Sequence, residues 1–174
     1  MKKNKLFYLL LIPLFLFTSQ SCTKNNDNSG TDWRTENEAH IGKIQSNPDY
    51  KEATVPQGPG SVYYKVLKDS VGETPLYTST VNVRYKGTLI DGTVFDDASN
   101  RIVTLSVNGT TVTPGFAIAL QNMKVGDKWE VHIPWQLGYG SSGYSGLSPS
   151  SNSISISSYS ALIFEIELVG ISQY

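Results

Sequence analysis

The stretch Val81-Asn-Val-Arg-Tyr-Lys-Gly-Thr-Leu-Ile-Asp-Gly-Thr-Val-Phe-Asp96 carries the clearest structural pattern in the chain. Its first half alternates apolar Val81, Val83 and Tyr85 with polar side chains, which is the period of a half-buried β-strand. Asp91-Gly92 then favours a tight hairpin turn, because glycine adopts the positive φ angles that such turns require. The stretch therefore predicts antiparallel strands whose apolar faces turn towards one core.

The same alternation recurs on both sides of this stretch. Apolar residues share one face in 62–66, 102–107, 128–133 and 161–171. One helix signal interrupts these strands: Thr113 is suited to an N-cap, and Pro114 to the first helical position, where its missing N–H costs nothing. Val125-Gly126 would end that helical segment. We therefore predict an antiparallel α+β domain.

The N-terminus predicts export. Lys2, Lys3 and Lys5 precede an apolar run over 6–17, which is typical of a secretory signal over residues 1–21. That run would rise only about 18 Å as a helix, too short for a hydrocarbon core of about 30 Å. Cys22, the chain's one cysteine, is placed as in a bacterial lipoprotein signal. We expect its lipidation to anchor the protein at a membrane of the cell envelope. The alternative is a soluble secreted protein with a spare thiol.

Residues 22–60 are expected to connect this anchor to the domain. The polar, Asn-rich segment 23–31 predicts a flexible tether. Residues 32–46 predict a short helix that ends before Pro48, and 55–60 form a turn-rich linker. The folded domain is expected over 61–174, in a protein that we expect to be a monomer. The sequence leaves open whether 32–60 packs on the domain or mediates self-association.

Charge and side-chain chemistry exclude several classes of function. Removal of Lys2, Lys3 and Lys5 with the signal would leave 11 of 14 basic residues against 15 acidic ones, which argues against nucleic-acid binding. His132 alternates with buried neighbours, so it is expected to face solvent, and neither it nor His40 has a metal-ligand partner nearby in sequence. The 11 serines of 141–160 have no adjacent base and are expected in a loop. We therefore expect no metal and no cofactor.

Four blocks together resemble the FKBP family of prolyl isomerases. The first is 81–96, quoted above. The others, in order, are Val112-Thr-Pro-Gly-Phe-Ala-Ile-Ala-Leu-Gln-Asn-Met-Lys-Val-Gly126, Ile133-Pro-Trp-Gln-Leu-Gly-Tyr-Gly140 and Ala161-Leu-Ile-Phe-Glu-Ile-Glu-Leu168. Four blocks in register are far more specific than any one of them. The resemblance implies a half-barrel sheet wrapped around the short helix, and an isomerase that acts on proline-containing polypeptides.

The resemblance also implies a site. The residues that would line an aromatic pocket for the proline ring are Tyr85, Phe95, Val112, Phe116 and Phe164. Tyr139 would donate its O–H to a substrate carbonyl, and the backbone N–H of Thr113 would hold a second carbonyl. Asp96 would lie at the pocket edge with Arg101 as its charge partner, or the pair would only order a loop. Arg101, Val103 and Ile156 are further candidate substrate contacts.

Three departures from the family pattern motivate other functions. Phe116 stands where well-known members have tryptophan, Thr113 replaces isoleucine or valine, and 141–160 replaces a compact Ile-Pro-Pro loop, so we expect weaker closure over substrate. One alternative is a module that binds proline segments without turnover. Another is a structural surface protein that contacts other envelope components through its serine-rich loop.

Overall fold

The computed structural model describes residues 29–108, 112–146 and 154–173. Within them, seven strands form one antiparallel sheet in the order β1-β2-β6-β9-β3-β4, with β5 paired to β3; β7 and β8 form a separate hairpin. The elements in chain order are α1 (Ser29–Gln45), β1 (Lys51–Ala53), β2 (Val62–Lys68), β3 (Thr80–Thr88), β4 (Val94–Asp97), β5 (Val103–Ser106), α2 (Pro114–Asn122), β6 (Lys128–Ile133), η1 (Trp135–Leu137, a 3-10 turn), β7 (Tyr144–Gly146), β8 (Ile154–Ile156) and β9 (Leu162–Gln173).

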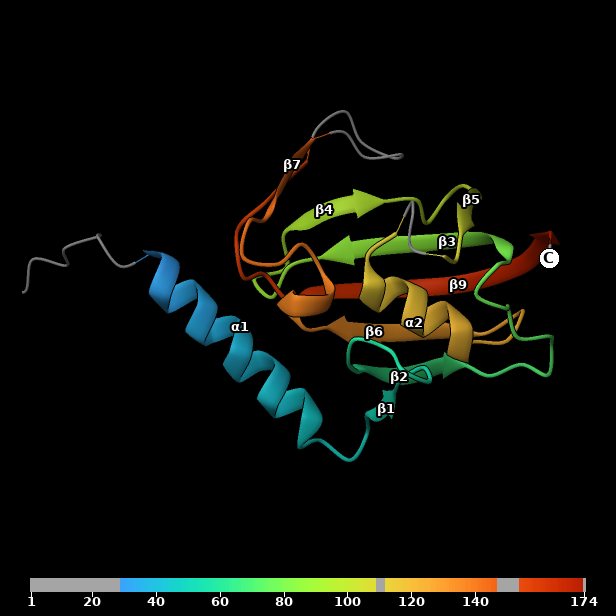
Figure 1. The fold of residues 1–174 in the computed structure, drawn as a ribbon, viewed down its shortest axis with the longest axis horizontal. Helices are drawn as coiled ribbons and strands as arrows, with labels where there is room; N and C mark the ends of the chain where they lie inside the picture. Colours follow the sequence, from blue (N-terminus) through green and yellow to red (C-terminus); the bar gives the residue numbers. More distant parts are fainter. Residues whose placement is uncertain (1–28, 109–111, 147–153, 174) are drawn as a thin grey trace, which may run out of the picture.

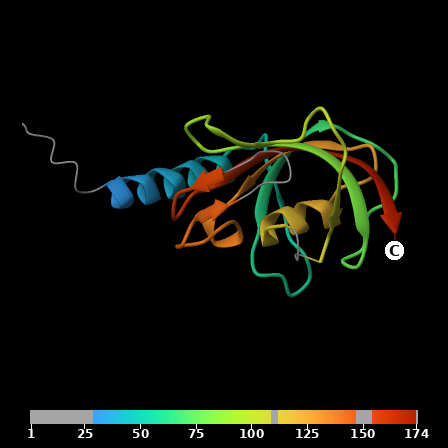
Figure 2. The ribbon, with the colours of Figure 1, turned by 90° about the horizontal axis from the view of Figure 1, so that it is seen from above.

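The sheet curves over α2, which lies against its concave face (Figures 1 and 2). Burial follows the predicted period of two along β3, where Val81, Val83 and Tyr85 turn inward and are buried. The sheet stays open, with β1 and β4 at the ends of the strand order. These observations confirm the predicted α+β class with an antiparallel half-barrel around a short helix.

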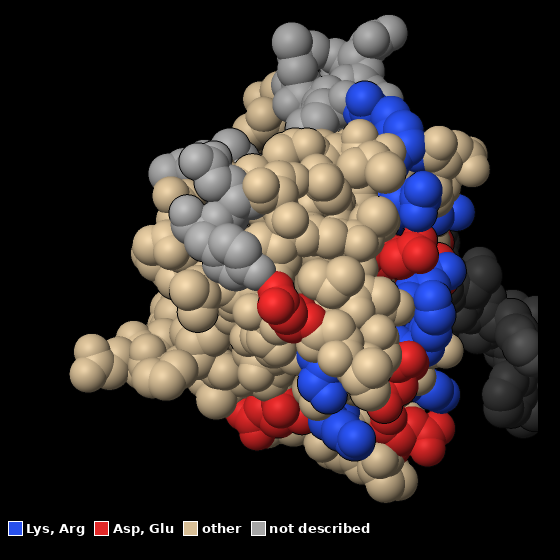
Figure 3. All heavy atoms as spheres, turned by 90° about the vertical axis from the view of Figure 1, so that its right-hand side faces the viewer, with Lys and Arg blue, Asp and Glu red and all other residues tan. Residues whose placement is uncertain are grey.

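The outer face of the sheet carries charged side chains of both signs (Figure 3). Arg84 on β3 lies 3.3 Å from Glu167 on β9, and Lys128 on β6 lies 2.7 Å from Glu165. Each pair joins neighbouring strands of the antiparallel ladder, where directly opposite or diagonal side chains come within reach. These charged pairs lie on the face of the sheet opposite to the buried Val81, Val83 and Tyr85.

The helix α2 begins where the sequence predicts. Thr113 is its N-cap and Pro114 occupies its first turn, although the Thr113 side chain makes no capping hydrogen bond. The residues from Gly115 to Leu120 are buried. A Cβ on Gly115 would lie 2.3 Å from Cγ2 of Ile133 on β6, so a glycine is needed for this close approach of helix to sheet.

The helix α1 packs on the domain (Figure 1), as the sequence allowed for residues 32–45; self-association through this segment stays an open alternative. Trp33 Nε1 donates to Ser160 Oγ at 3.0 Å, and the buried Asn37 accepts a 2.7 Å hydrogen bond from the Ala161 N–H. These two contacts hold the first half of α1 against the start of β9. The short strand β1, which pairs with β2, was not predicted.

The prediction that His132 faces solvent is wrong, because the residue is only 4% exposed. It does lie on the outer side of β6, but α1 covers that part of the sheet and brings the His40 ring to 5.1 Å from the His132 ring. Strand alternation assigns a residue to one of two faces. It does not reveal that a helix from a distant segment covers the outer one.

The serine-rich segment is not wholly a loop. Its described ends pair as the hairpin β7–β8, with Tyr144 opposite Ile156. The predicted signal, Cys22 and the start of the predicted tether lie outside the described residues. Among the helices that the structure describes, none has the length and apolar character needed to cross a bilayer.

Candidate functional site

Four aromatic rings from four elements converge inside the curve of the sheet. Phe164 of β9 is at the centre: its ring centroid lies 5.0 Å from Phe116 of α2, 5.4 Å from Phe95 of β4 and 6.1 Å from Tyr85 of β3. Tyr85 also contacts Phe116 at 5.7 Å. Each pair is edge-to-face, the favoured arrangement of aromatic quadrupoles.

Strand register explains why residues so far apart in sequence meet. Phe164 pairs with Gly87 of β3 on one side and with Val131 of β6 on the other, so it occupies the middle of the sheet. Tyr85 precedes Gly87 by two residues and therefore points to the same face. The hairpin at Asp91-Gly92, where Gly92 has φ of 84°, folds β4 back to place Phe95 beside them.

A buried carboxylate borders the ring cluster. The Tyr85 hydroxyl donates a 2.8 Å hydrogen bond to Oδ2 of Asp96, which is 8% exposed, and Oδ1 of Asp96 has no hydrogen-bond partner in the described structure. Burial, then the hydrogen bond and charge of Asp96, raise the pKa of Tyr85 well above its usual value. Tyr85 therefore stays a protonated donor throughout the physiological range.

Arg101 lies near this pair, since its charge acts on Tyr85 and slightly opposes the rise of the Tyr85 pKa. Its side chain is exposed in the turn between β4 and β5. The expected ion pair between Asp96 and Arg101 stays a prediction.

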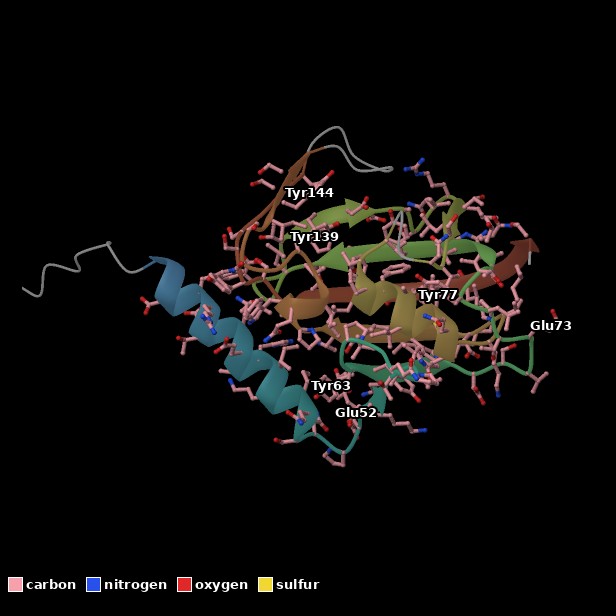
Figure 4. The ribbon with its side chains drawn as sticks, viewed as in Figure 1. Glu52, Tyr63, Glu73, Tyr77, Tyr139 and Tyr144 are labelled. Carbon is pink, nitrogen blue, oxygen red and sulfur yellow. The ribbon has the colours of Figure 1, made fainter. Side chains whose placement is uncertain are left out.

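Tyr139 lies in the loop after η1, and Tyr144 of β7 stacks on it with a ring distance of 4.9 Å and an angle of 28° (Figure 4). Burial raises the pKa of Tyr139, and nearby Tyr144 and Asp96 add to this rise. Tyr139 is thus a neutral phenol within electrostatic reach of the buried carboxylate. Sequence reasoning missed Tyr144, although it is one of only two aromatic residues in the serine-rich segment 141–160, which could have drawn attention to it.

The other predicted site residues lie around the same core. Ile156 on β8 is buried, and Val103 on β5 and Val112 before α2 are half-buried against the core cluster. Thr113 at the start of α2 is half-buried, and its hydroxyl oxygen is buried without a hydrogen-bond partner. The structure thus joins five predicted site residues in one network of contacts: Tyr85, Phe95 and Phe116 each meet Phe164, and Asp96 accepts the hydrogen bond from Tyr85. It sets Thr113 three residues before Phe116, at the N-terminal end of the same helix.

This arrangement offers apolar walls and hydrogen-bond donors rather than nucleophiles. In the described part of the chain, no three histidine, cysteine, aspartate or glutamate side chains are grouped so as to hold a metal ion. An apolar aromatic cluster with a few fixed polar groups is typical of a site that orients a ligand and removes water from it.

Comparisons with known proteins place the sequence in a family. The family model for FKBP-type peptidyl-prolyl cis-trans isomerases matches residues 72–169. The FKBP-type isomerase FkpA of Escherichia coli is 37% identical over 136 residues, which are 78% of this chain and 47% of that protein. The outer membrane protein MIP of Legionella longbeachae is 36% identical over 115 residues, 66% of this chain and 46% of that protein. The chain thus spans about half the length of these relatives.

Solved structures show the same likeness. A peptidyl-prolyl cis-trans isomerase from Pseudomonas syringae superposes with a TM-score of 0.68 at 28% sequence identity, over 82% of this chain and 96% of that one.

Proposed function

Because this chain belongs to the FKBP-type peptidyl-prolyl cis-trans isomerase family, we propose that it catalyses rotation about X–Pro peptide bonds in exported polypeptides. The observation that carries the proposal is the convergence of Tyr85, Phe95 and Phe116 on Phe164, beside the buried Asp96. This cluster supplies an apolar wall for a proline ring at the point where α2 begins.

The chemistry of the reaction suits such a site. An X–Pro amide resists rotation by about 18–20 kcal/mol because resonance gives its C–N bond partial double-bond character. No covalent bond breaks during this rotation, so the reaction does not need a nucleophile. An apolar environment that removes water from the carbonyl favours the twisted, less polar amide, and each 1.36 kcal/mol of that preference is worth about tenfold in rate.

We assign roles to individual groups on this basis. The rings around Phe164 hold the proline, the Tyr139 hydroxyl donates to one substrate carbonyl, and the backbone N–H of Thr113 donates to another. Asp96 keeps the Tyr85 phenol fixed in the wall through the 2.8 Å hydrogen bond. The half-buried Val103 and Val112, and the buried Ile156, extend the apolar surroundings. Arg101 orders the turn beside Asp96.

A protease-coupled assay on a short X–Pro peptide tests the proposal. The folded chain should accelerate isomerisation above the uncatalysed exchange time of about 10–100 s. Tyr139→Phe should lower kcat/KM several-fold, because one hydrogen bond is worth about 1 kcal/mol. Tyr63→Phe is the matched control: Tyr63 lies on β2, well apart from Tyr139 (Figure 4), so its loss of a hydroxyl should leave the rate unchanged.

The departures at Thr113 and Phe116 favour one other function, a module that holds proline segments without turning them over. Exchange spectroscopy on the same peptide distinguishes the two functions. Shifted peptide signals with an unchanged cis–trans exchange rate would establish binding alone and contradict the isomerase proposal.

We further propose that the mature protein is a monomer held in the cell envelope by lipid on Cys22. Support comes from the signal-like residues 1–21 and from the relative that is named an outer membrane protein. Cys22→Ser should abolish incorporation of labelled palmitate and release the protein from membranes. Sedimentation of the released form as a dimer would contradict the monomer.

A further inference from the structure

A chain of hydrogen-bonded titratable groups lies between α1 and the sheet, away from the aromatic cluster. His40 Nε2 of α1 is 2.9 Å from His132 Nδ1 of β6, and His132 Nε2 is 3.1 Å from Glu130 Oε1. The Tyr50 hydroxyl donates to the same Glu130 oxygen. His132 and Glu130 belong to the domain and His40 to the helix, so the His40–His132 contact joins two segments 92 residues apart.

The hydrogen-bond partners determine which ring nitrogen of His40 and of His132 carries the proton when both rings are neutral. Burial raises the pKa of Glu130, but hydrogen bonds from Tyr50 and His132 outweigh this and leave the pKa lowered, so Glu130 is an ionised acceptor. His132 must then donate from Nε2, which makes its Nδ1 an acceptor. His40 therefore donates from Nε2, and the chain of bonds runs in one direction.

The pair can take up one proton but not two. A proton added to His132 places N–H groups on both of its nitrogens, and His40 can still accept by moving its own proton to Nδ1. When both rings are charged, each nitrogen of the 2.9 Å contact carries a hydrogen. Two N–H donors cannot face each other at that distance, and two buried positive charges would add to the repulsion.

The groups around the two histidines decide in which direction their pKa values shift. The other titratable or charged groups around the pair are Lys43 on α1, Asp49 and Tyr50 before β1, Tyr63 and Lys65 on β2, and Glu130 on β6; β9 contributes the apolar Ile163. Burial lowers the pKa of His132 against the opposing effect of Glu130. Burial, His132 and Lys43 lower the pKa of His40. Docking of α1 is thus fully favoured above the ordinary histidine pKa of about 6.5 and weakens as pH falls below it.

The same interface extends to the loop that carries Tyr139. Glu38 of α1 accepts from Trp135 Nε1 at 3.2 Å, and the Arg34 guanidinium lies 4.8 Å from the Tyr159 ring. The Gly140 N–H donates to Trp135 O, and the Tyr159 N–H donates to Gly140 O. Trp135 and Tyr159, which α1 contacts, are therefore also hydrogen-bonded to the backbone of Gly140, next to Tyr139.

We propose that the His40–His132 pair is a pH-sensitive latch, which keeps α1 docked on the sheet while at least one ring is neutral and releases it when both are protonated. The latch concerns docking of α1, so its test does not depend on isomerase activity.

The three tryptophans of the chain provide the readout. The indole N–H groups of Trp33 and Trp135 donate across the α1 interface, whereas Trp129 is buried in β6. Nitrogen-15 spectra of the full chain between about pH 8 and pH 5 should show the Trp33 and Trp135 signals moving together towards an undocked position, with Trp129 unchanged. The ratio of undocked to docked helix should rise by up to about tenfold per pH unit for each extra proton taken up. Glu38 stays ionised in this range, since hydrogen bonds from Arg34 and Trp135 lower its pKa.

Two variants separate the latch from general weakening. His40→Gln keeps a donor for His132 but cannot be protonated, so the pH response should flatten while docking persists. Asn37→Ala removes the hydrogen bond to the Ala161 N–H, so it should raise the undocked fraction at every pH with an unaltered slope. The latch is wrong if the Trp33 and Trp135 signals do not change with pH. It is also wrong if the undocked fraction of the His40→Gln variant depends on pH as steeply as that of the unaltered chain.

If α1 is undocked at every pH in the His40→Gln variant, the latch is tested instead by titrating the histidine ring signals of the unaltered chain. Two separate, coupled steps, the second coincident with the Trp33 shift, support the latch. Two independent titrations with α1 still docked overturn it.

Discussion

Gly87 and Phe95 are in such close contact that a Cβ on the glycine would lie 2.6 Å from Cζ of the phenylalanine ring. The same Cβ would lie 2.8 Å from Cε1 of Phe164. Two rings of the candidate site thus pack directly on the bare backbone of β3. The absence of a side chain at Gly87 is what lets Phe95 and Phe164 meet edge-to-face.

Gly87→Ala should displace both rings. We expect a loss of about 1–3 kcal/mol in the free energy of unfolding, the usual cost of overpacking, together with lower isomerase activity. Urea denaturation and the peptide assay measure the two effects. Gly170→Ala is the control, since a Cβ there meets no atom within 4 Å, and equal losses in both variants would contradict the packing argument.

Tyr85→Phe should destabilise the domain, because it removes the donor to Oδ2 of the buried Asp96. A hydrogen bond to a charged group contributes about 1.5–3 kcal/mol, which chemical denaturation at neutral pH can measure. Asp96→Asn in the same background gives a double-mutant cycle. A coupling energy near zero would show that the 2.8 Å contact contributes nothing.

Alkaline pH should weaken the fold through the same tyrosine. The pKa of Tyr85 is raised in the folded protein, so its stabilisation is complete below the unfolded value of about 10 and is lost as pH rises towards the folded value. Above about pH 10, the unfolding free energy should fall by up to about 1.4 kcal/mol per pH unit from this group. Tyr85→Phe should make that decline shallower, and Tyr50, with a pKa raised to about 12 by burial and Glu130, should leave a residual slope.

Tyr144→Ala should lower kcat/KM by loosening Tyr139, whose ring it stacks on at 4.9 Å. Tyr144→Phe keeps the ring and should keep most of the activity. Relaxation of carbon-13-labelled tyrosine rings gives a direct measure, since Tyr139 should become more mobile only in the alanine variant. Equal activity of the Tyr144→Ala and Tyr144→Phe variants would show that the stacking of Tyr144 on Tyr139 does not contribute to catalysis.

Asn37→Ala should destabilise the chain by about 1–3 kcal/mol, because it leaves the Ala161 N–H without its partner at a buried position. Glu36→Ala, one residue away on the exposed side of α1, should change stability little. Denaturation of both variants, followed by tryptophan fluorescence, checks the difference. No difference would mean that the hydrogen bond between Asn37 and the Ala161 N–H adds nothing to the stability of the fold.

The sequence by itself determined the longer strands of the sheet and the short helix α2, while its resemblance to a family implied the ring residues of the site. Alternation along 81–85 and 161–168 is a local property of the chain, and a strand must bury its apolar face whatever its neighbours are. The Thr113-Pro114 start of α2 and the Asp91-Gly92 turn are equally local, since each depends on the conformational limits of one or two residues. These features therefore lie where the sequence predicts them.

Tertiary structure alone decided what covers each face. No local pattern indicates that His132 meets His40 across 92 residues of chain, that Tyr144 stacks on Tyr139, or that β1 joins the sheet edge. Such contacts depend on which distant segments lie next to each other, and the free energy that selects among those arrangements is shared by the whole core. The sequence gives the type of each of these residues, but only the tertiary structure shows which residue each one contacts.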